Sequence, residues 1–407
     1  MTQCFYPMNT LELYNQYVLK NYASPPLTLV RGEGTKVWDD QGREYLDFTS
    51  GVAVNAIGHS HPKWSKAISA QIDTLAHCSN LFAHPLQGEL AQKLADIIGP
   101  GQLFFCNSGA EATETLIKLA RLHGAPSGRH EVITALNSFH GRTFGGMSAT
   151  GQEKTQKGYH PLLPGFHYAE FNNIDSFRQA ITPQTSAILL ETVQGEGGIH
   201  PAGSKFLKAL RDLCDEHDLL LLIDEIQCGM GRTGEWMAYQ SSGISPDAVA
   251  LAKGLGGGFP IGAAWMSPKV SSLFQPGSHG STFGGNPMAC AAALAVIQII
   301  DEAGILKQVR KQSQTYHQQL GLLVEQYPQT FEGFRGQGYM MGLVLRDNPA
   351  ALIEQLRSNG LLTVPAAGNV LRLLPPLTVS SQELQTSLDI LHKTLSSSPS
   401  LESIPTS

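Results

Sequence analysis

Between residues 100 and 270, short apolar runs alternate with longer helix-like segments, and this order constrains the fold more than any other feature of the chain. Such an alternation is typical of strands that are joined by crossover helices and form a mostly parallel sheet. Several of the runs are apolar almost throughout, as expected for strands that are covered on both faces. The pattern predicts strands at 102–108, 130–138, 185–193, 219–226, 247–252 and 261–267, with helices at 111–123 and 205–217. The sequence therefore predicts an α/β fold.

The rest of the chain indicates a second lobe, because 407 residues exceed the size at which a single core usually stops growing. A long apolar-periodic segment begins at Pro287 and leads away from the sheet region. The strands expected near "KVWDDQGREYLDF" fit the same lobe as the C-terminal region. We expect an N-terminal segment at 1–50, a large domain at 51–286, a small α+β domain at 287–394 and a disordered tail at 395–407.

Composition limits the classes of partner. The formal net charge is −6 and no run of basic residues occurs, which argues against nucleic acid or an anionic membrane as a partner. The chain shows no signal-peptide pattern and no apolar stretch long enough to span a bilayer. The six cysteines lack CxxC spacing, which favours reduced thiols, and His59 and His61 are interpreted as turn and packing residues. We expect a cytoplasmic protein without a metal site.

Polar and special residues gather where five of the expected strands end. They are Asn107 to Gly109, Phe139 to Arg142, Glu191 and Glu196, Asp224 and Gln227, and Lys253. In an open α/β sheet, the carboxyl ends of the strands line the ligand crevice. We therefore expect these five strand ends to face one site.

Lys253 is the most informative of these residues, because it lies between an apolar run and a glycine-rich turn, "VALAKGLGGGF". The local sequence offers its charge no solvated face. A lysine amine in a dry pocket has a lowered pKa and can attack a carbonyl group. Asp224 ends a leucine-rich strand and is expected to face a ligand, whereas Glu225 is interpreted as a surface carboxylate that caps the next turn.

The turn at "CNSGAEATE" opens a helix, whose unpaired amides and Ser108 hydroxyl would suit a phosphate group. The alternative is that Ser108 is only an N-cap. A phosphate cradle, a buried carboxylate and a reactive lysine together match the needs of pyridoxal 5′-phosphate (PLP). This cofactor requires a Schiff-base lysine, an acidic partner for the pyridine nitrogen and a phosphate anchor.

A second class of function is suggested by a literal GxGxxG at 229–234, "GMGRTG", which is the fingerprint of a nicotinamide-dependent oxidoreductase. Its context argues against this interpretation, because Gly243 and Pro246 leave no room for a long helix after the loop. Asp224 and Glu225 would also repel a pyrophosphate. A serine hydrolase is not indicated, because no GxSxG motif occurs.

Long motifs of the chain resemble those of the class III (ω-) aminotransferases. The segments "LLIDEIQCGMGRTG" and "PDAVALAKGLGGGFPIGA" are similar to the cofactor-lysine signature of that family. Within the family, "NSGAEA", "SFHGRT", "QGEGGI" and "GSHGSTFGGNP" are most similar to the acetylornithine aminotransferases. The resemblance covers about residues 30–379 and implies a fold-type-I PLP-dependent transferase that forms a homodimer with shared active sites.

The resemblance also implies roles for the cofactor-binding residues. Lys253 would hold PLP covalently and move a proton, and Asp224 would keep the pyridine nitrogen protonated. Gln227 would bond the ring hydroxyl and Phe139 would stack on the ring. The remaining positions would bind phosphate, in the same subunit through Ser108, Gly109 and Ala110 and in the neighbouring subunit through Thr282.

Two arginines, Arg142 and Arg372, are placed by the resemblance at carboxylate-binding positions. Glu196 would pair with Arg372 until 2-oxoglutarate brings a second carboxylate. Gly51 would leave room for an N-acyl group, unless backbone geometry alone requires it. The substrate-binding set is completed by Ser281 and Tyr22.

The implied reaction moves the δ-amino group of N2-acetyl-L-ornithine to 2-oxoglutarate. Succinylornithine, succinyl-diaminopimelate, ornithine and 4-aminobutyrate stay open as alternative donors, and a cofactor-binding protein without activity is the remaining alternative. Two positions depart from the family pattern, because Thr192 stands where proline is usual and Thr113 where asparagine is common.

Overall fold

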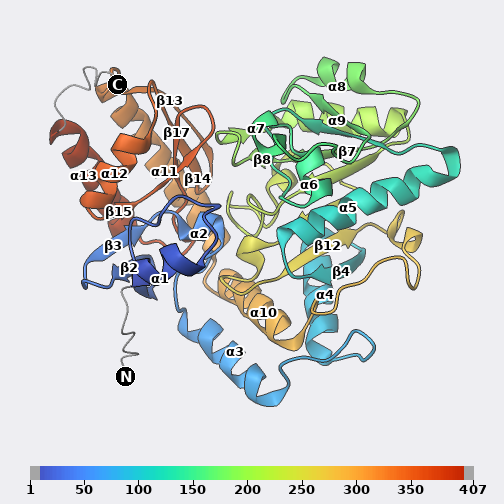
Figure 1. The fold of residues 1–407 in the computed structure, drawn as a ribbon, viewed down its shortest axis with the longest axis horizontal. Helices are drawn as coiled ribbons and strands as arrows, with labels where there is room; N and C mark the ends of the chain where they lie inside the picture. Colours follow the sequence, from blue (N-terminus) through green and yellow to red (C-terminus); the bar gives the residue numbers. More distant parts are fainter. Residues whose placement is uncertain (1–9, 398–407) are drawn as a thin grey trace.

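The computed structural model describes residues 10–397 as two lobes joined by long helices (Figure 1). The large lobe contains a seven-stranded sheet with helices on both faces, and the small lobe contains two four-stranded sheets and the C-terminal helices. The large lobe lies on the right of Figure 1 and the small lobe on the left. The placement of domain boundaries at residues 50 and 286 stays a prediction.

The central sheet of the large lobe has the strand order β4-β12-β11-β10-β7-β5-β6. The neighbouring strands from β11 to β6 are parallel, and β12 is antiparallel to both of its neighbours. The bounds are β4 Gln102–Cys106, β5 Glu131–Ala135, β6 Phe166–Ala169, β7 Thr185–Glu191, β10 Leu220–Asp224, β11 Ala248–Leu251 and β12 Gly262–Met266. The mostly parallel sheet is therefore confirmed, and each predicted strand overlaps an observed one.

The strand β6 was not predicted. Its four residues, "FHYA", lie at the edge of the sheet and only Ala169 is buried. An edge strand covered on one side lacks the continuous apolar run that marks the central strands.

Both faces of the sheet are covered, which explains the continuous apolar character of β10. Leu221 and Ile223 belong to one core cluster, and Leu220 and Leu222 belong to another on the opposite face. The predicted helices are confirmed as α5 Gly109–Gly124, in the second cluster, and α9 Ser204–Glu216, in the first. Helix α9 buries residues at 206, 207, 210, 213 and 214, the spacing of one helix face.

The small lobe is built from both ends of the chain. One sheet has the order β1-β2-β3-β15 and the other β13-β14-β17-β16. Their strands are β1 Leu29–Glu33, β2 Lys36–Asp39, β3 Glu44–Asp47, β13 Phe331–Gln337, β14 Met340–Leu345, β15 Leu361–Leu362, β16 Val364–Ala366 and β17 Val370–Leu373. The helices are α11 Ile305–Gln326, α12 Ala350–Ser358 and α13 Ser381–Ser397.

Helix α13 corrects the expected start of the C-terminal tail. Residues 395–397 continue the helix, and Leu395 is buried in the core of the small lobe because it follows Leu388 and Leu391 on the same helix face. The rest of the predicted tail, and Cys4, lie outside the described residues.

The long segment after Pro287 forms α10 Pro287–Glu302, which continues into α11 through Gly304. No single helix in residues 10–397 is long and apolar enough to cross a membrane, and α10 and α11 pass that test only as a pair bent by 65°.

The remaining elements are α1 Thr10–Tyr17, α2 Ser50–Ala53, α3 Pro62–Thr74, α4 Pro85–Ile98, α6 Phe144–Ala149, α7 Glu153–Gln156, α8 Ile174–Ala180, β8 Val193–Gln194, β9 His200–Pro201 and the 3₁₀ helices η1 Ala125–Ser127, η2 Ala238–Ser242, η3 Lys253–Leu255 and η4 Ser271–Leu273.

Candidate active site

A cavity of about 440 Å³ lies at the carboxyl ends of β4, β5, β7, β10 and β11, the five strands whose ends carry the polar residues. This volume is within the usual range for small-molecule sites. Nine of the residues predicted to bind cofactor or substrate line it. They are Ser108, Gly109, Ala110, Phe139, Arg142, Glu196, Asp224, Gln227 and Lys253.

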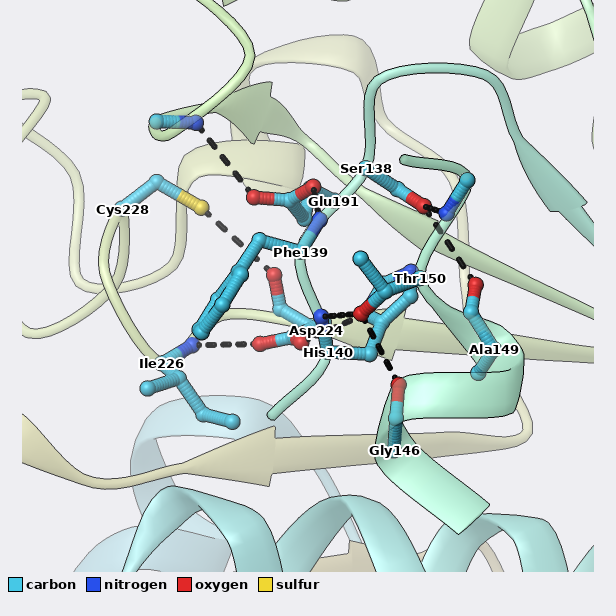
Figure 2. A network of polar contacts seen from close by, with 12 residues as sticks. Ser138, Phe139, His140, Gly146, Ala149, Thr150, Glu191, Asp224, Ile226 and Cys228 are labelled. Carbon is cyan, nitrogen blue, oxygen red and sulfur yellow. Dashed lines mark hydrogen bonds and ion pairs between the residues drawn. The ribbon is translucent and has the colours of Figure 1, made fainter. Parts of the chain in front are cut away.

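Asp224 is held at the end of β10 by two neighbours (Figure 2). Its Oδ1 atom accepts the backbone N–H of Ile226 at 3.0 Å, and its Oδ2 atom lies 2.8 Å from Nδ1 of His140. His140 is fully buried, which lowers the pKa of its imidazole, but the hydrogen bond and charge of Asp224 outweigh this and raise the pKa overall. A buried carboxylate requires a cationic or protonated partner, and His140 supplies it for Asp224.

His140 was not assigned a role in the sequence, although it follows Phe139 directly. Its backbone N–H donates to Oγ1 of Thr150 at 2.9 Å, which fixes the turn that carries the ring (Figure 2). The Nε2 atom of the ring is buried and has no partner within the described part of the chain. Contact with Asp224 could not be read from the sequence, because the two residues are 84 positions apart.

Glu191, at the end of β7, connects two loops of the site. Its carboxylate accepts the backbone N–H of Phe139 at 2.9 Å (Figure 2) and that of Gly195 at 3.3 Å. Burial raises the pKa of Glu191 to about 7, with the Asp224 charge adding to this effect and His140 opposing it. Glu191 thus positions both the aromatic ring of Phe139 and the loop that leads to Glu196.

Lys253 begins η3 and has a φ of 44°, a left-handed conformation that is unfavourable for a lysine. Burial lowers the pKa of its amine, the Glu196 charge opposes that shift, and the Arg372 charge adds to it. The amine makes no hydrogen bond or ion pair with the residues that the structure describes. A lowered pKa favours the neutral form of the amine, which is the form that a nucleophile and proton carrier requires.

Helix α5 begins at the cavity. Oγ of Ser108 accepts the backbone N–H of Glu111 at 3.3 Å, so Ser108 is an N-cap and lines the cavity at the same time. The N–H groups of Gly109 and Ala110 have no protein acceptor among the described residues. A Cβ atom on Gly109 would lie 2.9 Å from Ile226, which explains the glycine.

These features fit PLP. Two free amides at a helix N-terminus are suited to the phosphate, the Asp224 carboxylate to the pyridine nitrogen and the Lys253 amine to the aldehyde. The residues present can therefore hold the cofactor that the sequence predicts.

The other end of the cavity is a paired cluster of Glu196, Arg372 and Gln227. The two carboxylate oxygens of Glu196 accept Nη1 and Nη2 of Arg372 at 2.6 and 3.1 Å, a bidentate ion pair. Burial would raise the pKa of Glu196, but the charge and hydrogen bonds of Arg372 outweigh it and lower the pKa. Nε2 of Gln227 lies 3.4 Å from Oε1 of Glu196, and its Oε1 atom accepts Nη1 of Arg372 at 3.4 Å.

The backbone of the small lobe completes this cluster. The guanidinium of Arg372 donates to the carbonyl of Pro365, and the N–H of Ala367 donates to the carbonyl of Glu196 at 3.0 Å. A Cβ atom on Gly195 would lie 2.0 Å from Oε1 of Gln227, so a larger residue there would displace the amide from Arg372. The pair is therefore a contact between lobes.

Arg142 differs from Arg372, because it is exposed and has no ion pair among residues 10–397. Its guanidinium carbon lies 5.6 Å from the centre of the Phe139 ring. Arg142 therefore lines the cavity without an ion pair in the described structure, whereas Arg372 is paired with Glu196, which lines the cavity in its place.

Five predicted site residues do not line the cavity, and one of them is Arg372, which contacts the lining residues Glu196 and Gln227. Ser281 and Thr282 line a separate hollow with Asn107, and Nδ2 of Asn107 donates to Oγ of Ser281 at 3.2 Å. Tyr22 is 77% exposed. Gly51 is exposed and has a φ of 62°, so backbone geometry alone favours glycine there, whereas its neighbour Val54 does line the cavity.

Glu225 was expected at the surface, and this prediction is wrong. It is buried with 1% exposure and accepts the N–H groups of Ala238 at 2.8 Å and Tyr239 at 3.0 Å, so it does cap the next turn, η2, but from inside the core. Oγ1 of Thr192 also donates to it at 2.7 Å. Thr192, one of the two departures from the family pattern, therefore joins the loop after β7 to the end of β10.

The other departure, Thr113, is buried in α5 and its hydroxyl has no hydrogen-bond partner in the described structure.

The "GMGRTG" loop does not open a long helix, since the next element is the short η2. Oδ2 of Asp47 lies 2.8 Å from Nε2 of His59, and no cluster of metal-ligating side chains is found among residues 10–397.

Comparison with known proteins identifies the family. The family model described as Aminotransferase class-III matches residues 17–395. A protein named acetylornithine aminotransferase from Caldanaerobacter subterraneus subsp. tengcongensis is 46% identical over 94% of this chain and 98% of its own.

Two solved structures are also similar. The acetylornithine aminotransferase from Elizabethkingia anophelis is 32% identical with a TM-score of 0.84, over 94% of this chain and 97% of its own. The ornithine aminotransferase from Toxoplasma gondii, whose description reports partial occupancy of PLP at the active site, is 30% identical with a TM-score of 0.90, over 94% of this chain and 93% of its own. The chain therefore belongs to the class III aminotransferase family of PLP-dependent enzymes.

Proposed function

We propose that this aminotransferase moves the δ-amino group of N2-acetyl-L-ornithine to 2-oxoglutarate, giving N-acetyl-L-glutamate 5-semialdehyde and L-glutamate. The observation that carries this proposal is the bidentate ion pair between Glu196 and Arg372 beside the Lys253 amine. Similarity to proteins named acetylornithine aminotransferase supports the choice of donor.

When bound, PLP supplies an electron sink for the bond that breaks at the substrate carbon. Lys253 has the role of taking a proton from that carbon and returning it, which requires a neutral amine such as its lowered pKa favours. Asp224, whose carboxylate His140 keeps in place, would hold a proton on the pyridine nitrogen. Phe139, whose backbone N–H is held by Glu191, would pack against the ring.

The two arginines distinguish the two substrates. A donor that is aminated far from its carboxylate requires one arginine, and the free Arg142 is available for it. Such a donor leaves Glu196 paired with Arg372. A 2-oxoglutarate molecule has a second carboxylate next to the reacting carbon, and this group displaces Glu196 from Arg372. One cavity can therefore accept both substrates.

We also propose that the enzyme is a cytoplasmic homodimer with shared active sites. Thr282 is exposed outside the cavity of its own chain, and its neighbour Phe283 is 60% exposed. An exposed aromatic next to a phosphate-binding threonine suits a contact with a second subunit.

The test is a half-reaction. The PLP-loaded protein is mixed in turn with N-acetylornithine, N-succinylornithine, ornithine and 4-aminobutyrate, and the absorbance of the cofactor is followed as it is converted to its aminated form. Fast conversion with N-acetylornithine, and slow conversion with the others, is the expected result. Faster conversion with another donor would replace the assigned substrate, and no conversion with any donor would refute the function.

A further inference from the structure

The "GMGRTG" loop contains a buried arginine that the reaction does not use. Arg232 is 2% exposed, and burial lowers the pKa of its guanidinium to about 10, so it stays a cation at neutral pH. It forms no ion pair with any described residue. Removing a guanidinium from water without a counter-charge is costly, so stability alone does not explain this residue.

The contacts of Arg232 cross from the large lobe to the small lobe. Its Nη1 atom donates to the backbone carbonyls of Pro375 and Tyr339, the latter at 3.5 Å, and its own carbonyl accepts the N–H of Tyr339 at 2.8 Å. A Cβ atom on Gly338 would lie 2.5 Å from the carbonyl oxygen of Arg232, which shows how closely the two segments approach each other. The Nη2 atom is buried and has no hydrogen-bond partner among residues 10–397.

The two carbonyls belong to the strands that carry the substrate arginine. Tyr339 directly precedes β14, and Pro375 lies two residues after the end of β17. Arg372 is in β17 and pairs with Gly342 of β14. The guanidinium of Arg232 therefore joins the start of one strand to the exit of its neighbour, three residues from Arg372.

The segment after Arg372 is held on both sides of Pro375 as well. The N–H of Leu374 donates to the carbonyl of Phe48 at 2.7 Å, and the N–H of Leu377 donates to that of Ala56, also at 2.7 Å. Pro375 has no N–H, so its carbonyl is the group through which this residue can be held. Arg232 supplies the donor for it.

We propose that Arg232 is a positioning residue for the substrate carboxylate. By holding the start of β14 and the exit of β17 against the large lobe, it sets the place of the Arg372 guanidinium. This inference depends on the proposed function, because Arg372 binds a substrate only when Glu196 is displaced. Arg232 therefore matters for 2-oxoglutarate and L-glutamate and much less for N-acetylornithine.

The test compares two donors on the PLP-loaded enzyme, L-glutamate and N-acetylornithine, by the absorbance change of the cofactor. Arg232→Met removes the donor and the buried charge while keeping a similar length. We expect the apparent dissociation constant for glutamate to rise on the order of tenfold or more, and that for N-acetylornithine to change less than about twofold. Arg232→Lys should recover part of the loss for glutamate.

Arg310→Met is the matched control. Arg310 also bridges the lobes, from α11 to the carbonyl of Gly234 at 2.7 Å and the carboxylate of Glu235 at 2.9 Å, but its guanidinium has no hydrogen bond to β14 or β17. Its replacement should leave the ratio of the two constants unchanged. A shift of that ratio equal to the shift in Arg232→Met would overturn the inference.

Equal losses with both donors in Arg232→Met, or an unchanged constant for glutamate, would also overturn it. If Arg232→Met does not fold, the comparison is made with Arg232→Lys and is decided by the same ratio. A wild-type enzyme that reacts with glutamate but prefers another ω-amine would refute the proposed donor only, and that amine then replaces N-acetylornithine in the test. A wild-type enzyme that ignores both compounds would refute the proposed function itself.

Discussion

The two ends of the cavity are built in different ways. The end suited to PLP is made by one lobe, from the strand ends that carry Asp224, His140, Glu191 and Lys253. The end suited to the substrate is made between lobes, where Glu196 of the large lobe meets Arg372 of the small lobe. The first is a product of sheet topology, and the second is a product of packing between distant segments.

This difference indicates where the site can respond to its ligand. The carboxylate of Asp224 is enclosed by β10 and by His140, so it has little freedom to move. The Glu196 carboxylate is on a loop between two glycines, and its side chain is 30% exposed. A carboxylate that changes its hydrogen-bond partner during the reaction is therefore expected at Glu196 and not at Asp224.

The largest effect is expected at the cofactor end. Lys253→Ala should reduce turnover by several orders of magnitude, because it removes both the nucleophile and the proton carrier. The Glu196–Arg372 pair does not depend on the lysine for its hydrogen bonds, so the fold and Tm should be retained. Steady-state kinetics and thermal melting measure both, and near-normal turnover would contradict the role of Lys253.

The substrate end is tested by two variants that should differ in kind. Arg142→Ala should weaken both half-reactions, on the order of a hundredfold, because a carboxylate of each substrate loses its free arginine. Glu196→Ala should change mainly the relative reactivity of N-acetylornithine and glutamate, since Arg372 is then unpaired with both. Stopped-flow half-reactions distinguish the two patterns, and equal losses with both donors in Glu196→Ala would argue against exchange of partners.

A pH-dependent effect is expected from Glu225, whose pKa burial raises to about 7 from an ordinary 4.5. The folded protein then holds this proton more tightly than the unfolded chain, so its contribution to stability falls as pH rises through that interval. The shift corresponds to roughly 3 kcal/mol. The Tm of Glu225→Gln minus the Tm of the wild type should therefore be more positive at pH 8 than at pH 5.

The control for this experiment is Glu153→Gln, which changes an exposed carboxylate in α7. Its Tm difference from the wild type should vary little between the two pH values. A Glu225→Gln difference that is the same at both pH values would show that the buried carboxyl group does not hold its proton as described.

The smallest effect is expected at the link between the two strand ends. Thr192→Val removes the hydroxyl that donates to Glu225 at 2.7 Å and leaves a buried carboxylate with one donor fewer. We expect a loss of about 1–2 kcal/mol in stability, seen as a lower Tm. Thr192→Ser keeps the donor and should retain most of the wild-type Tm, whereas equal losses in both variants would point to packing of the methyl group instead.

Much of the large lobe could be predicted from the sequence, because each central strand is an apolar run covered on both faces. The convergence of five strand ends followed from the same argument. The edge strand β6 and the buried position of Glu225 could not be predicted, since both depend on what covers a surface and not on the local pattern. The apolar run before Asp224 does not show that Glu225 would be enclosed by η2, whose first residue, Ala238, lies 13 positions after Glu225.

The substrate end was predictable only in part. Glu196 and Arg372 were paired through the family resemblance, but the contact between Arg232 and Pro375 joins residues 143 positions apart. In the sequence, Arg232 is a variable position of a GxGxxG motif, and that pattern gives no role to its side chain. A buried cation without a counter-charge becomes visible only when the two lobes are in place.

The measurement that tests the central claim most directly is reductive trapping of PLP on the protein, followed by peptide mapping by mass spectrometry. The account predicts that the cofactor label is found on Lys253, and that prior addition of N-acetylornithine removes it. A label on another lysine, or a label that N-acetylornithine does not affect, would contradict the site described here.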